Sequence, residues 1–428
     1  MSDLQKPSPE EAADLLAQGV GRRTLLRASA GLLAAGAVSS TATKAAAVTT
    51  ANHGPVNILQ PGVGRIVGTY VPARPDEVLW GHLPIATTPP ILTVSSGAVL
   101  TIDAVSHEGI LEDQGKDPVE FFGYRGVPRD HILKDQIEIA RTREHIGPGP
   151  HVVTGPIHLR GAEVGDVLKV EVLDIRLRVP YGVVSSRHDR GALPGIYPDA
   201  WEDDPRYRKY FNQGGNVSVF TPVRTRNDEL VGVMPGPTRP RFPLNPFMGI
   251  MGVARNTTGM VDSVPPTDTG GNMDVNDFGM GSVVYLPIRV PGAKFFIGDP
   301  HQAQGDGEVA LTAMEGSLRG TFRLTVIKPG GRAPKIAFSY PFGETADHWI
   351  PIGLSDPDGN RNGNITDLDT AMRKAVMNAL QFLTEEMGMD APVAYTYLSA
   401  AVDFQVSQVV DRTKGIHALI RKSDFERW

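Results

Sequence analysis

Glycine and proline interrupt this chain at short intervals along its whole length. Its 428 residues include 47 glycines and 35 prolines, which favour turns and end regular elements. This distribution of glycine and proline predicts short strands joined by turns and argues against a helical bundle. Residues 168–172 and 322–326 support this prediction, because apolar and polar side chains alternate in them as in half-buried strands. We therefore expect a mainly β fold with an α+β portion.

A helix is predicted near the C-terminal end. Apolar residues recur there at helical spacing, at Leu368, Met372, Val376, Ala379, Leu380, Leu383 and Met387. Asp367 or Asp369 can cap its start, and Gly388 ends it. A second helix is expected over residues 394–401, with a strand from Val402 onward.

Composition excludes several classes of protein. The chain is 41% hydrophobic and 21% charged, which is typical of a globular protein with a core and two to three domains. A net charge of -6 without a basic stripe, and 7% aromatic residues, argue against nucleic-acid binding. Cysteine is absent, so any metal must be held by His, Asp, Glu, Asn or backbone oxygen.

The N-terminal segment predicts export. Residues 21–27, with Arg22 and Arg23, resemble a twin-arginine signal. The apolar run over residues 28–38 is too short for a membrane span, and three alanines at 45–47 offer a cleavage site. The alternative is an amphipathic leader helix with a chance Arg pair. We expect residues 1–55 to be leader and linker, and the mature protein to reach the periplasm or cell exterior without a stable membrane anchor.

Residues 298–308 concentrate groups that bind metals. Asp299, His301, Asp306 and Glu308 lie there among glycines, after an apolar segment that predicts a strand. Side chains two apart on a strand share a face, which would pair Asp299 with His301 and Asp306 with Glu308. Carboxylates with one imidazole suit a divalent cation such as zinc. The alternative is a polar loop whose acids cap turns.

Several segments, in the same order along the chain, resemble the acetamidase/formamidase family. They are residues 90–94, 102–104, 155–166, 270–274, 298–308, 347–349 and 368–372. The segment 298–308 is similar to the family's G-D-x-H-x-x-x-G-D-G-E, and 270–274 to its G-G-N-x-D. The chain departs from the family's pattern at residues 106–109 and over residues 179–240.

The resemblance implies a fold, an assembly and an activity. The implied fold is a jelly-roll-like β-sandwich domain plus a smaller α+β domain that carries the C-terminal helices. We expect a β-rich part with long loops over residues 56–245, and a part with the metal-site motif over residues 246–428. The implied protein is a homo-oligomer that hydrolyses linear, non-peptide amides like formamide or acetamide. The alternative is an exported binding protein that kept the scaffold without turnover.

Amide hydrolysis needs an activated water, a polarised carbonyl and a proton donor, and a divalent metal supplies the first two. Our candidate metal ligands are Asp103, Asp299 and His301, with zinc as the expected ion. Asp103 alone also fits a turn at a strand end, and His301 a hydrogen-bonded loop histidine. A structural calcium site is the further alternative, because oxygen ligands are numerous.

The proton shuttle is predicted to be Glu308, with Glu163 as its rival, and Asp306 as a further base or ligand. For substrate binding we predict Asn272 and Asp274, with Gly271 allowing close approach to the backbone. Asn272 also fits an Asx-turn.

Other histidines and acids have lesser predicted roles. His107 and Glu108 are candidates for supporting a ligand, His151 precedes the motif at 155–166, and Glu315 is predicted to be a structural partner. No G-x-S-x-G elbow, Ser-Ser-Lys context or phosphate-binding loop occurs in the sequence.

Overall fold

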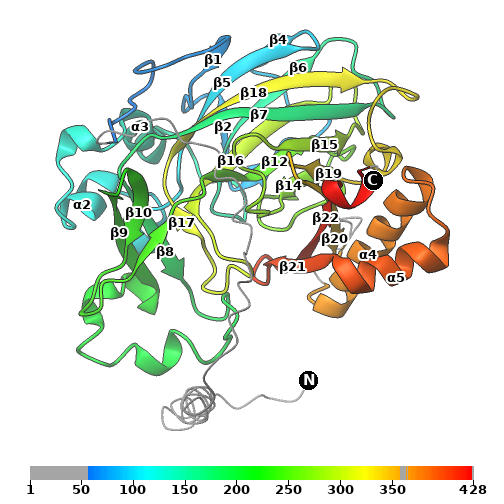
Figure 1. Ribbon diagram of the computed structural model, residues 1–428. Coiled ribbons are helices and arrows are strands. Elements are labelled where there is room, and N and C mark those ends of the chain that lie inside the picture. Colours follow the sequence, from blue (N-terminus) through cyan, green and yellow to red (C-terminus); the bar gives the residue numbers. More distant parts are fainter. Residues whose placement is uncertain (1–55, 357–362, 364, 427–428) are drawn as a thin grey trace, which may run out of the picture.

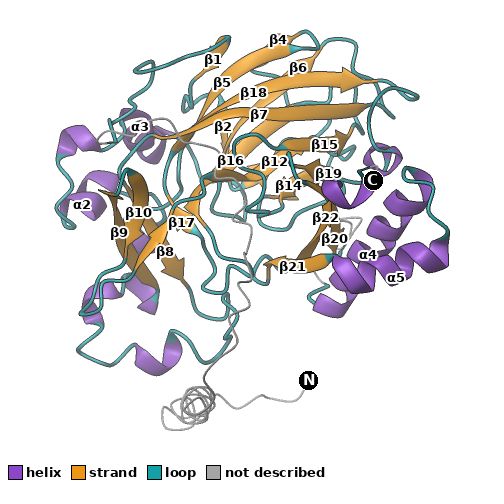
Figure 2. Cartoon of the chain, in the orientation of Figure 1, coloured by secondary structure: helices purple, strands orange, loops and turns teal. Residues whose placement is uncertain are grey.

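The computed structural model describes residues 56–356, 363 and 365–426. The predicted leader and linker at residues 1–55 lie outside the described residues. Two large sheets are the main elements of this part of the chain, and the helices lie at their periphery (Figure 1, Figure 2). The predicted mainly β fold with C-terminal helices is confirmed.

The first sheet has nine strands. In spatial order they are β1 (Thr69–Val71), β5 (Ala98–Ala104), β18 (Leu318–Ile327), β7 (Val167–Leu177), β15 (Val283–Pro287), β19 (Phe342–Glu344), β20 (His348–Leu354), β22 (Gly415–Arg421) and β21 (Asp403–Gln408). Neighbouring strands are antiparallel except β1 and β5. The alternation predicted at residues 168–172 is confirmed in β7, where Lys169 and Glu171 are more exposed than their apolar neighbours.

The second sheet has eleven strands. Its main path is β11 (Arg241–Pro243), β10 (Glu229–Val233), β9 (Val217–Arg226), β8 (Tyr181–Ser186), β17 (Met314–Glu315), β16 (Phe295–Ala303), β12 (Phe247–Val253) and β14 (Gly270–Asn272). A branch leaves β16 through β6 (Val152–Leu159), which pairs with β2 (Val78–Trp80) and β4 (Leu92–Val94). A small separate sheet joins β3 (His82–Leu83) and β13 (Val261–Asp262).

The two sheets share one large apolar core. Phe295 of β16 lies edge to face with Phe322 of β18, with ring centroids 6.3 Å apart. Buried residues of β5, β7, β12 and β15 belong to the same cluster. Both sheets combine strands from residues 56–245 with strands from residues 246–428. The two parts expected from the sequence are therefore interleaved in the sheets.

Two helices lie at the β20–β22 end of the first sheet, where the first packs on these strands and the second packs on the first. They are α4 (Leu368–Glu385) and α5 (Ala391–Ala401), as predicted, and the Asp367 side chain accepts the Asp369 N–H at the start of α4. Small side chains face the sheet: Ala371 and Ala375 are fully buried, whereas Leu368 and Met372 are partly exposed. The helix contacts the sheet closely, because a Cβ on Gly353 would lie 2.1 Å from the Ala375 nitrogen.

The remaining helices are short. They are α2 (Pro118–Gly123) and α3 (Lys134–Thr142), with 3-10 turns η1 (Glu112–Gln114), η2 (Arg129–His131), η3 (Asp199–Trp201), η4 (Arg208–Tyr210), η5 (Gln213–Gly215), η6 (Lys335–Phe338) and η7 (Lys422–Phe425). Among the described residues, no helix has the length and apolar character needed to cross a membrane.

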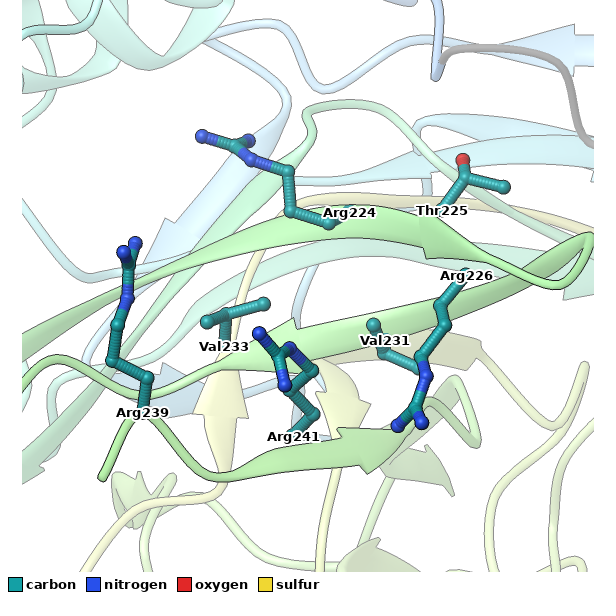
Figure 3. Close-up of a pocket in the computed structure, with 7 residues that line it drawn as sticks. All are labelled: Arg224, Thr225, Arg226, Val231, Val233, Arg239 and Arg241. Carbon is teal, nitrogen blue, oxygen red and sulfur yellow. The ribbon is translucent and has the colours of Figure 1, made fainter.

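The β9–β10–β11 portion has two different faces. The strand register pairs Arg224 with Val231, and Arg241 with Val233, so these two arginines and two valines lie on the same face (Figure 3). Side chains alternate along a strand, which directs Phe242 to the opposite face. On that opposite face, Phe242 lines a hollow that Glu308 also lines.

Candidate metal centre

Six segments of the chain bring acidic and histidine side chains to one buried pocket. Asp299 and His301 come from β16, and Glu315 comes from the paired strand β17. Others lie where strands end: His107 follows β5, His151 precedes β6, Asp274 follows β14, and Glu308 follows β16. All seven side chains are at most 7% exposed. We call this set the metal pocket.

The metal pocket contains three overlapping groups of possible ligands. They are His107, His151 and Asp299; Asp274, His301 and Glu308; and Asp299, His301 and Glu315, each with ligand atoms within 4.8 Å of one another. Asp299 and His301 each belong to two groups, so they are at the centre of the pocket.

Distances place the histidine nitrogens around the two oxygens of Asp299. His301 Nε2 lies 3.1 Å from Asp299 Oδ2 and 3.1 Å from Glu315 Oε1. His151 Nε2 lies 3.4 Å from Asp299 Oδ2, and His107 Nδ1 lies 3.5 Å from Asp299 Oδ1. This is a mixed nitrogen and oxygen donor set of the kind that zinc and related divalent ions prefer.

Buried donor and acceptor atoms here lack hydrogen-bond partners. Within the described part of the chain these atoms include Asp299 Oδ1, both oxygens of Asp274, Glu308 Oε2 and Glu315 Oε2. Buried polar atoms are nearly always satisfied, so a convergent set of unsatisfied ones indicates a bound group. The residues present therefore fit a divalent cation.

A glycine keeps space open beside these atoms. A Cβ on Gly249 of β12 would lie 2.4 Å from Asp274 Oδ1, 2.7 Å from His301 Cε1 and 3.0 Å from Asp299 Oδ2. Any other residue at position 249 would therefore displace the side chains of the metal pocket.

Three carboxylates of the metal pocket have strained backbones. Asp274, Asp299 and Glu308 have φ of 50°, 50° and 46°. Residues other than glycine rarely adopt positive φ, and such conformations cost about 1–3 kcal/mol each and cluster at functional sites. At Asp299 this conformation occurs inside β16, so the strand is locally irregular where its side chain enters the pocket.

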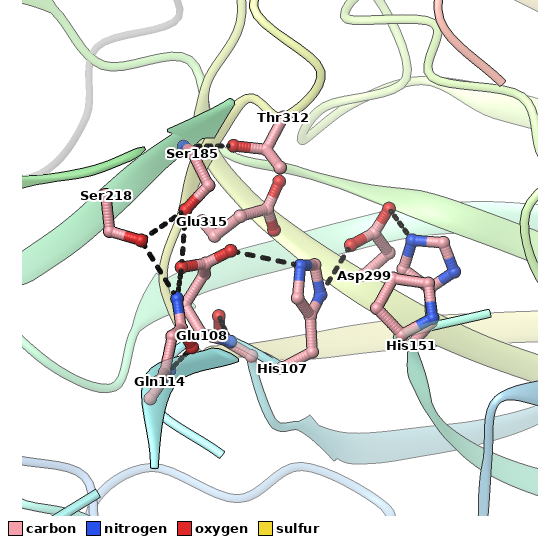
Figure 4. Close-up of polar contacts among 12 residues, drawn as sticks. His107, Glu108, Gln114, His151, Ser185, Ser218, Asp299, Thr312 and Glu315 are labelled. Carbon is pink, nitrogen blue, oxygen red and sulfur yellow. Dashed lines mark hydrogen bonds and ion pairs between the residues drawn. The ribbon is translucent and has the colours of Figure 1, made fainter. Parts of the chain in front are cut away.

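A hydrogen-bond network contacts the edge of the His107 ring that faces away from Asp299 (Figure 4). Glu108 Oε1 lies 3.5 Å from His107 Nε2, on the ring edge that faces away from Asp299. The Ser185 hydroxyl donates to Glu108 Oε2 over 2.7 Å, and the Gln114 amide donates to the same oxygen. Arg187 Nη2 lies 3.5 Å from Glu108 Oε1. A carboxylate on the second nitrogen of a ligand histidine orients its ring.

The two flanking histidines have opposite electrostatic environments. Burial disfavours the charged form of His107, but Asp299 and Glu108 outweigh it and raise its pKa to about 10. Burial lowers the pKa of His151 to about 4, despite the opposing charge of Asp299. His151 is therefore a neutral imidazole at pH 7, which is the form that binds metals.

The carboxyl groups of the pocket also differ in acidity. Burial raises the pKa of Glu315 to about 7 and that of Asp274 to about 6. Burial and the charge of Asp274 raise the pKa of Glu308 well above its usual range. Burial acts in the same direction on Asp299, but His151 and His301 outweigh it and lower its pKa well below the usual value. A cation would favour the ionised form of every one of these carboxylates.

Four residues predicted from the sequence come together in the metal pocket. They are Asp299 and His301, predicted as ligands, Glu308, predicted as proton shuttle, and Asp274, predicted to bind substrate. Asn272 and Gly271 lie on the adjoining strand β14. The Asn272 amide donates to Asp411 over 3.0 Å, and the pKa of Asp411 is raised well above its usual value by burial and by Asp274.

Asp103 lies in an ion pair instead of among the candidate ligands. Cross-strand register places it opposite Arg319, whose Nε and Nη2 donate to its two oxygens over 2.6 and 2.9 Å. The Tyr70 hydroxyl donates to Oδ2 over 2.6 Å. Since guanidinium and phenol occupy both oxygens, Asp103 has a structural role here, contrary to the ligand role expected from the sequence.

The two rivals of Glu308 lie outside the metal pocket. The Glu163 side chain is 77% exposed and lies 3.1 Å from Lys328. Asp306 is exposed and accepts a hydrogen bond from Asn276 over 3.0 Å. The chain leaves the extended conformation after Ala303, so Asp306 and Glu308 do not form the same-face pair that a continuous strand would give.

Three members of the pocket had only weak signals in the sequence. His107 and His151 were expected at most to support ligands, and Glu315 to be structural. Their imidazoles and carboxylate belong to the ligand groups around Asp299. The signal that could have found them is position: His107 and Glu315 each lie at or just beyond a strand end, and His151 immediately precedes β6.

Comparison with known proteins identifies similar sequences. The profile of the acetamidase/formamidase family matches residues 143–262 and 255–421. A formamidase from Methylophilus methylotrophus is 26% identical over 300 residues, covering 61% of this chain and 73% of the formamidase. An acetamidase from Mycolicibacterium smegmatis is 28% identical over 299 residues, covering 59% and 73%.

Solved structures share the fold. An acetamidase from Yersinia enterocolitica superposes with a TM-score of 0.62 at 24% identity, covering 86% of this chain and 96% of the other. An acetamidase from Bacillus halodurans gives a TM-score of 0.59 at 23% identity, covering 83% and 98%.

Proposed function

This chain belongs to the acetamidase/formamidase family, and we propose that it hydrolyses linear, non-peptide amides at the metal pocket. It is an amidase, a hydrolase that acts on carbon–nitrogen bonds. The finer proposal is dependence on a divalent metal, with zinc as the expected ion and calcium as the alternative. The observation that supports it is the set of unsatisfied buried atoms around Asp299 and His301.

We assign the ligand role to Asp299 and His301, completed by members of the three overlapping groups other than Glu308. An ion held there would lower the pKa of a bound water to about 7 and polarise the amide carbonyl. Glu108 fixes the ring of His107 toward Asp299, and Gly249 leaves room for the ion and the substrate's carbonyl end.

Glu308 is our candidate proton shuttle. It lies beside Asp274 and His301, and its pKa is raised well above the usual range by burial and by Asp274. A carboxyl of raised pKa can accept a proton from the attacking water and pass it to the departing nitrogen near neutral pH. The products are a carboxylate and ammonia, and Asn272 and Asp274 remain candidates for holding the substrate amide.

The test combines elemental analysis of the purified chain with ammonia release from a panel of short amides, before and after chelation. We expect stoichiometric zinc and ammonia release that chelation abolishes and added zinc restores. Glu308→Gln should lose ammonia release while retaining metal, and Glu120→Gln, an exposed residue of α2, should match the unmodified chain. Stoichiometric metal without ammonia release from any amide would support a binding or structural role instead.

We also propose export and assembly. Replacing Arg22 and Arg23 with lysine should retain the chain in the cytoplasm, and an unmodified chain found only in the cytoplasm would contradict export. Light scattering should give a mass of several chains. A mass no larger than one chain, 46.0 kDa, would contradict assembly.

A further inference from the structure

A hollow of about 570 Å³ adjoins the metal pocket. Glu308 belongs to both, so a molecule in the hollow reaches the groups assigned to the chemistry. The lining near Glu308 is polar and well ordered by hydrogen bonds. Gln304 Oε1 lies 2.9 Å from His301 Nδ1, and Asn245 Oδ1 accepts the Gln304 backbone N–H over 3.1 Å.

The opposite wall of the hollow is apolar. Its main side chains are Val184 of β8, Met234 just after β10, Phe242 of β11 and Met314 of β17. Gly232 gives this wall its shape, because a Cβ there would lie 2.5 Å from Phe242 Cζ and 3.1 Å from Met314 Sδ. Ring and thioether therefore pack directly against the backbone of β10.

The size of the hollow exceeds what a one- or two-carbon amide requires. Pockets of roughly 300–1,000 Å³ hold drug-sized ligands, and acetamide would leave most of the apolar wall in contact with water. Burial of apolar surface is favourable in proportion to its area. A substrate with a longer apolar chain would cover Met234, Phe242 and Met314 while its carboxamide lies at Glu308.

We propose that this enzyme acts on primary amides whose acyl group is an apolar chain of several carbons. The carbon–nitrogen bond breaks, water supplies the second oxygen of the new carboxylate, and both protons of that water leave with nitrogen as ammonium. The inference rests on the proposed function for the position of the reacting carbonyl. Val184 and Met234 of this wall lie within the stretch over which the sequence departs from the family's pattern.

The experiment measures kcat/KM for formamide, acetamide, butyramide and hexanamide with the full chain as purified. A buried methylene is worth about 0.8 kcal/mol, so kcat/KM should rise about fourfold per added methylene until the hollow is filled. Met234→Gln should lower the ratio of hexanamide to acetamide about tenfold. Met377→Gln, on the exposed side of α4 at 58% exposure, is the matched control and should leave the ratio unchanged.

A binding measurement separates this inference from the proposed function. Calorimetry with hexanamide should show binding that Met234→Gln weakens. If hexanamide binds in this way but no amide is cleaved, the acyl pocket stands and the amidase mechanism at this site fails. If acetamide is cleaved best and hexanamide is neither bound nor cleaved, the mechanism stands and the acyl pocket is overturned. The chain-length series on the unmodified protein decides the matter even if Met234→Gln fails to fold.

Discussion

At the residue scale, the metal pocket contains residues held in unfavourable backbone conformations. Asp299 has a positive φ within a strand and is within 3.5 Å of three imidazoles. At position 249 beside it, only glycine leaves the carboxylates in place. Such strain persists only when the surroundings impose it, and here paired strands on both sides of β16 do so.

Asp299→Asn should abolish metal binding, because it removes the carboxylate common to two ligand groups. Ammonia release should fall by more than roughly 100-fold, since even the hydrogen-bond partners of metal ligands are worth about 10–100-fold. Elemental analysis and an ammonia assay give both results. Asp203→Asn, on an exposed loop, is the control. Full metal content in Asp299→Asn would remove Asp299 from the ligands.

Glu108→Gln should weaken metal binding roughly 10–100-fold without removing a ligand. The reason is that Glu108 holds the outer nitrogen of His107 and is itself fixed by Ser185 and Gln114. Competition with a chelator of known affinity measures the change, and Glu112→Gln at the surface should show none. Unchanged affinity together with a lowered melting temperature would leave Glu108 with a purely structural role.

At the element scale, close approach between neighbouring elements depends on glycine. β12 approaches the metal pocket through Gly249, and α4 approaches β20 through Gly353. At both places an added Cβ would overlap atoms of the neighbouring segment, at 2.4 Å and 2.1 Å. The two glycines have different consequences, because one faces the pocket and the other faces a helix.

Gly249→Ala should reduce metal content and ammonia release together, because the new methyl displaces Asp274, Asp299 or His301. We expect the melting temperature measured after chelation to change less than metal affinity does. Gly259→Ala, whose added Cβ meets nothing closer than 3.8 Å, should behave like the unmodified chain. Normal metal affinity in Gly249→Ala would show that the pocket does not need this space.

Gly353→Ala should destabilise the fold by about 1–3 kcal/mol, the usual cost of overpacking. The added methyl would overlap the backbone of α4 at Ala375, so the helix must move away from the sheet. Denaturant unfolding measures the change, and Gly123→Ala, where an added Cβ meets nothing within 4 Å, is the control. Metal content should be retained, because α4 contributes no residue to the metal pocket.

At the scale of the whole molecule, the site lies where the two parts of the chain meet. The metal pocket takes His107 and His151 from the first part and the remaining ligand candidates from the second. A bound ion would therefore stabilise the whole core of interleaved strands and not a single loop.

Metal removal should accordingly lower the melting temperature. A ligand that binds only the folded state stabilises it by about 2.7 kcal/mol at a free concentration of ~100 Kd. Buried carboxylates left without a cation add to the loss. Calorimetry with and without chelator measures this, and restored metal should reverse it. The same melting temperature in both conditions would mean that no metal binds the folded chain under those conditions.

Local patterns in the sequence were sufficient for the mainly β fold, the helix α4 with its Asp367 cap, and the presence of Asp299, His301 and Glu308 in one segment. Side-chain alternation and helical spacing act over a few residues, so they can be read along the chain. Contacts between distant segments cannot be read along the chain in this way. Sheet pairing placed Arg319 opposite Asp103, so Asp103, a predicted ligand, forms an ion pair instead. Pairing of β6 and β17 with β16 brought His151 and Glu315 to the pocket, and packing of the first sheet on the second brought His107, because those positions depend on the whole core.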